Sequence, residues 1–229
     1  MSEEDTTAPV EEAGSDVVGL GAEDAAATAG DSVGGEKEDP KWKMRLARIA
    51  SVQGLVLLVS LCLFAAADSW TAVTGLAFAS VLGVITGLIA GVVMTSVIHE
   101  VFHLLGAQVS GGAYRIPPKV GIFLYDWQFE RNSVDQFFVM SIAGSVGGAI
   151  SVILLWNAVP ADTIGRATLR GAAVAAFVYA AIIEWPVLQR TRRTREPLAE
   201  LSKIDEKVLM RSLYGGLIAG VITIYWVFE

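Results

Sequence analysis

Five long apolar stretches dominate the chain, and charged residues gather in the segments between them. Each stretch is long enough to cross the roughly 30 Å hydrocarbon core of a bilayer as an α-helix. The pattern therefore predicts an all-α polytopic membrane protein with about five transmembrane helices. The predicted spans cover residues 49–67, 71–97 with apolar character continuing to 109, 133–156, 169–189 and 209–228.

The segment between the second and third spans interrupts the helical pattern. Its sequence, SGGAYRIPPKVGIFLYDWQFERN, begins with paired glycines and paired prolines and continues with residues that favour β-strands. We predict a short β hairpin or strand here, on the cytoplasmic side of the membrane. The alternative is an amphipathic loop that lies on the membrane surface.

Small residues recur at every fourth position of the second span. They share one face of the predicted helix, and a face of small residues lets a neighbouring helix approach closely. Two histidines continue the same rhythm, so the closely packed face should also carry their imidazoles. The series runs Gly75, Ala79, Gly83, Gly87, Gly91, Thr95, His99 and His103.

Composition supports a membrane protein and sets the N-terminus apart. Hydrophobic residues make up 53% of the 229 residues, more than is usual for a soluble domain. Residues 1–40 contain seven Glu and five Asp against one Lys, a net charge of −11, and no aromatic residue. We predict that residues 1–40 form a disordered acidic tail and that residues 41–229 form the membrane domain. The tail either binds a partner or reflects adaptation to high salt.

Basic residues at the ends of the predicted spans indicate the orientation, because cytoplasmic loops are enriched in Lys and Arg. Five crossings then place the N-terminus and the 110–132 loop in the cytoplasm and the C-terminus outside, and we expect the protein in the cell membrane. Membrane orientation also explains the basic segment RTRRTR, so we expect no nucleic-acid binding. The basic residues are Lys41, Lys43, Arg45 and Arg48 before the first span, and Arg190, Arg192, Arg193 and Arg195 after the fourth.

The only two histidines of the chain, His99 and His103, occur in the sequence His-Glu-Val-Phe-His. Residues four apart share a helix face, so both imidazoles can bind one zinc ion. Glu100 would then face a water molecule and act as the catalytic base for its attack on a carbonyl group. The alternative is that the two imidazoles only form hydrogen bonds inside the helix bundle.

A catalytic zinc ion usually has three protein ligands, and without a third histidine the third ligand must be a carboxylate. Glu184 in the fourth span is the preferred candidate, because its depth in the membrane is compatible with that of His99. An ion pair with Arg190 is an alternative role for Glu184. Asp135, at the start of the third span, is the second candidate, and capping of that helix is its own alternative role.

Residues 71–189 resemble the site-2 protease family of intramembrane zinc metalloproteases. The resemblance is carried by the motif from His99 to His103 with Ala107 four residues later, and by the sequence FVMSIAGSVGGAIS in the third span. It implies a zinc-binding membrane helix, connecting surface strands, an Ala-Gly-containing third core helix and an acidic ligand on a later helix.

The chain departs from that family pattern at three places. Phe102 stands where the family usually has Gly, and Ile183-Glu184-Trp185 stands where it has Leu-Asp-Gly. The Pro-x-x-x-Asn pattern expected after Ala-Gly is absent, and no segment has room for a PDZ domain. The resemblance is therefore to a divergent, minimal member, and Glu184 corresponds to the family's acidic ligand by position and chemistry only.

The function implied is hydrolysis of peptide bonds in or near transmembrane segments of membrane proteins, with Zn²⁺ as cofactor and the lipid bilayer as surroundings. An unwound substrate would pair with the strand region 113–130 by β-strand addition. One alternative is a membrane metallopeptidase that cuts cytosolic loops. The other is a non-catalytic metal-binding or scaffolding membrane protein derived from a protease.

Overall fold

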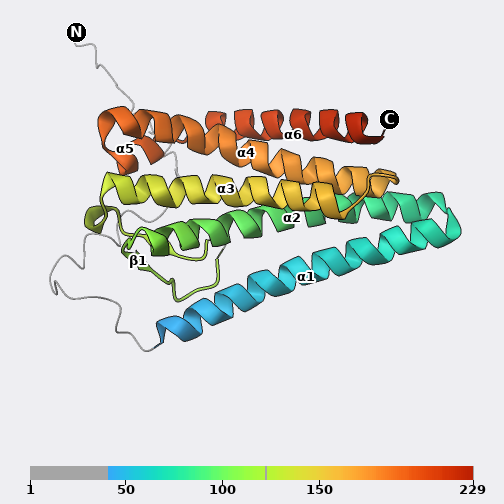
Figure 1. The fold of residues 1–229 in the computed structure, drawn as a ribbon, viewed down its shortest axis with the longest axis horizontal. Coiled ribbons are helices and arrows are strands. Elements are labelled where there is room, and N and C mark those ends of the chain that lie inside the picture. The colour runs from blue at the N-terminus through green and yellow to red at the C-terminus, as the bar shows by residue number, and fades with distance from the viewer. Residues whose placement is uncertain (1–40, 122, 229) are drawn as a thin grey trace, which may run out of the picture. The chain divides into compact units, whose positions relative to one another are not determined.

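The computed structural model describes residues 41–121 and 123–228. In this part of the chain five helices are long and apolar enough to cross a membrane, which confirms the predicted all-α polytopic fold (Figure 1). The prediction of an acidic tail falls on residues 1–40, outside the described residues. The five helices are α1 (Trp42–Thr74), α2 (Ala77–Val109), α3 (Val134–Ala158), α4 (Ile164–Thr194) and α6 (Glu206–Phe228).

Most of the helices extend beyond the apolar stretches that predicted them. Hydropathy identifies the part of a helix that contacts lipid. The helix itself extends further, to a residue whose backbone conformation or side-chain cap ends it. Helix α1 ends at Gly75, which adopts the left-handed conformation with φ of 64° that glycine accepts without strain. Helix α3 begins at Ser133, whose hydroxyl accepts a hydrogen bond from the Gln136 backbone N–H in a capping box.

Helix α2 is the centre of the bundle and contacts α1, α3 and α4, while α4 in turn contacts α6. The small residues of α2 face α4 at short range. A Cβ atom added to Gly87 would lie 2.6 Å from the carbonyl oxygen of Gly165, and one added to Gly91 would collide with the carbonyl oxygen of Leu169. The prediction that the small-residue face of the second span packs inward is therefore confirmed from Ala79 onward, whereas Gly75 lies in the turn before α2 and is not part of that face.

A two-stranded antiparallel hairpin connects α2 to α3, as the sequence predicted. Strand β1 (Tyr114–Arg115) pairs with β2 (Asp126–Trp127), and a short 3₁₀ helix, η2 (Phe129–Arg131), follows. The Asn132 side chain holds the hairpin to the start of α3, because its amide accepts a hydrogen bond from the Ala113 N–H and donates one to the Ala113 carbonyl.

The hairpin packs against the end of the bundle. Leu124 is 2% exposed and belongs to a buried cluster that also includes residues of α1, α2, α3 and α4. The short helix α5 (Pro197–Leu201) covers the same end, because Leu201 packs against this cluster. The Arg48 guanidinium also donates to the Pro118 carbonyl of the hairpin loop. The basic residues at the end of α4 thus lie at the same end of the bundle as those at the start of α1.

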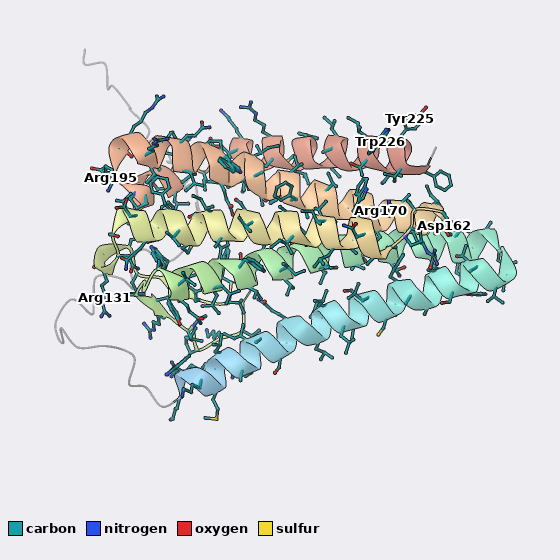
Figure 2. All side chains as sticks on the ribbon, viewed as in Figure 1. Arg131, Asp162, Arg170, Arg195, Tyr225 and Trp226 are labelled. Carbon is teal, nitrogen blue, oxygen red and sulfur yellow. The ribbon has the colours of Figure 1, made fainter. Side chains whose placement is uncertain are left out.

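Charged side chains gather at the two ends of the bundle, while large apolar side chains are exposed along its length. Arg131 and Arg195 lie at the hairpin end, and Asp162 and Arg170 lie at the other (Figure 2). An apolar outer surface between two polar ends is what a bilayer requires. The assignment of the hairpin end to the cytoplasm stays a prediction.

Candidate metal centre

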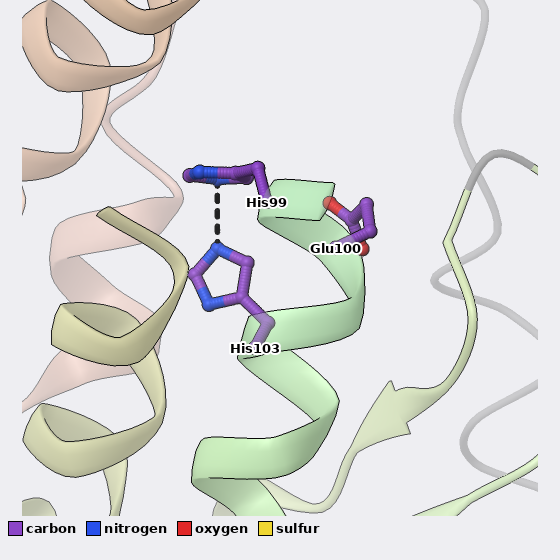
Figure 3. Close-up of side chains that lie close together, drawn as sticks. All are labelled: His99, Glu100 and His103. Carbon is purple, nitrogen blue, oxygen red and sulfur yellow. Dashed lines mark hydrogen bonds between the residues drawn. The ribbon is translucent and has the colours of Figure 1, made fainter. Parts of the chain in front are cut away.

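Helix α2 carries the two histidines on one side and Glu100 on another (Figure 3). Because one helical turn separates the imidazoles, their rings meet edge to face with centroids 4.5 Å apart. The Nε2 atom of His103 lies 2.9 Å from the Nε2 atom of His99. Both rings therefore present the same nitrogen to one point between α2 and its neighbours.

Glu184 reaches this point from helix α4. Its Oε1 atom lies 2.7 Å from Nε2 of His99 and 3.2 Å from Nε2 of His103. The ligand atoms of a tetrahedral zinc site, each about 2.0–2.1 Å from the metal, lie about 3.3 Å from one another. The observed triangle is only slightly smaller, so the three side chains fit a zinc ion with little movement.

The hydrogen bonds of the imidazoles also suit a metal. Nδ1 of His103 lies 3.0 Å from the Met140 carbonyl oxygen, which can only accept, so Nδ1 carries the proton and the lone pair of a neutral ring is on Nε2. Nδ1 of His99 is buried without a partner among the described residues. Nε2 of His103 and the Glu184 carboxylate oxygen are thus both acceptors, and a cation held between them and Nε2 of His99 would satisfy them.

Helix α3 orients the carboxylate and makes room for the rings. The Ser145 hydroxyl donates a hydrogen bond of 3.1 Å to Oε2 of Glu184, which leaves Oε1 toward the imidazoles. A Cβ atom on Gly144 would overlap three ring atoms of His103, and one on Gly147 would lie 2.5 Å from the Phe102 side chain. The glycine face of α3 thus accepts both His103 and the bulky Phe102.

Glu100 is the second carboxylate near the histidines. One of its oxygens lies within 4.8 Å of a ring nitrogen of each histidine, which is compatible with metal ligation by Glu100 itself. Glu184 is the closer candidate, because its Oε1 atom is within hydrogen-bond distance of both imidazoles. Glu100 is left half-buried beside the site, where it can exchange protons with a water molecule.

A cavity of about 230 Å³ adjoins these groups. Glu100, His103 and Glu184 lie in its wall, and the remaining walls are almost entirely apolar. Alternate residues of the segment 123–129 face it, as expected for an extended chain that runs past the site. The other lining residues are Phe123, Tyr125, Trp127 and Phe129 of the hairpin region, Phe137, Met140 and Ser141 of α3, Ile183, Val187 and Leu188 of α4, and Leu201 of α5.

The second candidate ligand, Asp135, does not reach the histidines. Its side chain is 80% exposed and pairs with Arg195 at 3.3 Å, in the first turn of α3. The alternative role considered for Asp135 is also wrong, since Ser133 caps this helix. The ion pair considered for Glu184 is wrong as well, because Arg190 pairs with Glu200 of α5 at 2.8 Å.

Several contributors to the site could not be recognised in the sequence. The roles of the Met140 carbonyl and of Ser145 depend on how α3 is rotated against α2 and α4. Tyr125 had a partial signal, because aromatic residues recur at every second position from Phe123 to Phe129. This period predicts a common face for the four aromatics but not the cavity that they line.

Comparison with known proteins gives this site no precedent. No family model, no curated protein sequence and no solved structure matches the chain. The resemblance to a protease family accordingly stays a prediction from the motif. The function of the protein must be argued from the geometry of His99, Glu100, His103 and Glu184 themselves.

Proposed function

We propose that the protein is an intramembrane zinc metalloprotease, a divergent and minimal member of the site-2 protease family, that hydrolyses peptide bonds in or near transmembrane segments of membrane proteins. One observation carries the proposal. Nε2 of His99, Nε2 of His103 and Oε1 of Glu184 converge from two apolar helices, with Glu100 beside them. Placing an ionisable group inside a membrane costs free energy, so such groups usually have a function.

His99, His103 and Glu184 would hold the zinc ion, which supplies a Lewis acid that polarises a carbonyl group and acidifies water. Glu100 accepts a proton from the water molecule as its oxygen attacks the peptide carbonyl carbon, and returns a proton to the leaving amine. The Met140 carbonyl fixes the tautomer of His103. The acid-base group Glu100 and two of the three proposed metal ligands, His103 and Glu184, thus line one cavity.

The cavity beside the site favours an unwound substrate. Its apolar walls suit an extended segment with large apolar side chains, such as the locally unfolded end of a transmembrane helix. Strands β1 and β2 are short, so strand addition would use only the edge nearest Trp127.

We place the hairpin end, and with it the opening of the cavity, on the cytoplasmic side of the cell membrane, with the C-terminus outside. The basic residues at the start of α1, such as Lys43, and at the end of α4, such as Arg193, support this orientation, because cytoplasmic segments are enriched in Lys and Arg. Water would reach the site from the cytoplasm. A protease-cleavable tag on the C-terminus should therefore be removed by a protease that is added outside intact cells.

Cleavage of defined peptides tests the proposal. The protein, purified in detergent with added zinc, is incubated with single-span transmembrane peptides, and new termini are identified by mass spectrometry. The wild type should cut within or next to the apolar segment, and Glu100→Gln should be inactive. Equal cleavage by wild type and Glu100→Gln would sink the proposal. Cuts confined to soluble loops would favour the metallopeptidase alternative, and a site that serves only metal binding predicts no cut in any variant.

A further inference from the structure

Tyr125 occupies a fixed position in the hairpin region beside the metal centre. Its side chain is 8% exposed and belongs to the buried cluster that joins the hairpin to the helices. Its ring meets that of Tyr114 edge to face, with centroids 5.6 Å apart. The ring therefore has little freedom to turn, and the position of the hydroxyl follows from the fold.

The hydroxyl of Tyr125 has no hydrogen-bond partner among the described residues, although Tyr125 lines the same cavity as Glu100, His103 and Glu184. A buried phenol normally finds a partner. The indole N–H of Trp127 also has no partner among the described residues, but it is closed off from solvent. Tyr125 is thus an open donor of the cavity, and a bound substrate would complete its hydrogen bond.

Tyr125 also stays protonated near neutral pH. Burial raises the pKa of its hydroxyl above the ordinary value of 10.0, and the negative charges of Glu100 and Glu184 raise it further. Because Tyr125 lines the cavity that Glu100 and Glu184 also line, its protonated hydroxyl can donate a hydrogen bond to a substrate bound there and cannot act as a base.

We propose that Tyr125 is a catalytic residue of the hydrolysis, whose hydroxyl donates a hydrogen bond to the carbonyl oxygen of the substrate as that oxygen gains negative charge. This inference rests on the proposed function. A donor that is already in place stabilises the transition state without having to reorganise during the reaction. A tyrosine from the hairpin supplies a polar donor in the cavity beside the site.

Hydrolysis of the peptide bond would proceed in two steps, attack by water and release of the amine. The water oxygen bonds to the carbonyl carbon, the electron pair of the C=O double bond moves onto the carbonyl oxygen, and Glu100 takes one water proton. Tyr125 keeps its own proton and only donates a hydrogen bond to that oxygen. When the double bond forms again, the C–N bond breaks and Glu100 passes its proton to the amine.

Tyr125→Phe removes only the hydroxyl, and Tyr114→Phe is the matched control on the neighbouring ring. Removing one such donor should lower kcat by about 100-fold. KM and zinc content should stay within about twofold and the thermal midpoint should change little, because the hydroxyl makes no hydrogen bond with the described residues. Tyr114→Phe should change none of these quantities. Full kcat in Tyr125→Phe, or the same loss in both variants, would overturn the inference.

A binding measurement separates this inference from the proposed function. A phosphinic peptide, whose tetrahedral anion mimics the transition state, should bind Tyr125→Phe at least about tenfold more weakly than wild type, while an uncleaved peptide binds both equally. Equal binding of the phosphinic peptide would refute the role of Tyr125. If Glu100→Gln proves as active as wild type, the proposed function fails instead, whatever Tyr125→Phe shows.

Discussion

A methyl group added at position 144 is expected to displace His103, one of the proposed zinc ligands. In Gly144→Ala the new Cβ atom would overlap Cε1, Nε2 and Nδ1 of His103. Atoms in van der Waals contact lie about 3.5–4.0 Å apart, so the ring would have to retreat by roughly 1 Å. The hydrogen bond of Nδ1 to the Met140 carbonyl and the contact of Nε2 with Glu184 both oppose that movement.

A misplacement of this size should weaken zinc binding and cleavage by about 100-fold, which for binding is about 2.8 kcal/mol. Zinc affinity is measured by competition with a chelator in detergent, alongside the thermal midpoint. Gly54→Ala is the matched control, because a Cβ atom on Gly54 meets nothing within 4 Å. Wild-type zinc affinity in a folded Gly144→Ala variant would refute the assignment of His103 as a ligand in this geometry.

Three further predictions concern the surroundings of the site. Ser145→Ala should weaken zinc binding by about tenfold, because Glu184 loses the hydrogen bond that orients it, and unchanged chelator competition would count against that role. Asp135→Asn should leave zinc content and cleavage unchanged, and loss of either would return Asp135 to the site. The hydrogen bond from Lys203 holds the pKa of Glu200 below its ordinary value of 4.5. Glu200→Gln should therefore lower the thermal midpoint at pH 7, with a difference that shrinks as the pH falls below 4.5, and a difference independent of pH would exclude this ion pair as the cause.

Hydropathy alone predicted the fold class, because the bilayer imposes one requirement on every span. It missed the helix ends, which depend on local features such as the left-handed Gly75 and the capping box at Ser133. The hairpin was predicted from Gly, Pro and strand-forming residues. That it packs against the bundle, with Leu124 buried, follows from tertiary contacts that no local pattern contains.

The candidate site was predictable where it lies within one helix. The spacing of His99 and His103 fixes their common face, and the structure brings them together as expected. Glu184 was preferred to Asp135 only because of its depth in the membrane. Of these two candidates, the structure brings only Glu184 to the histidines. Ser145 shows the limit, since a serine on a glycine-rich helix gives no sign of which carboxylate it will meet.

The most direct test of the account is zinc per chain in the purified protein, measured by elemental analysis after exposure to zinc and gel filtration. Wild type and Glu100→Gln should each retain about one zinc ion, and His99→Ala and Glu184→Ala should retain almost none. Asp135→Asn should behave as wild type. A folded wild type that holds no zinc, or a Glu184→Ala variant that keeps a full equivalent, would contradict the proposed centre.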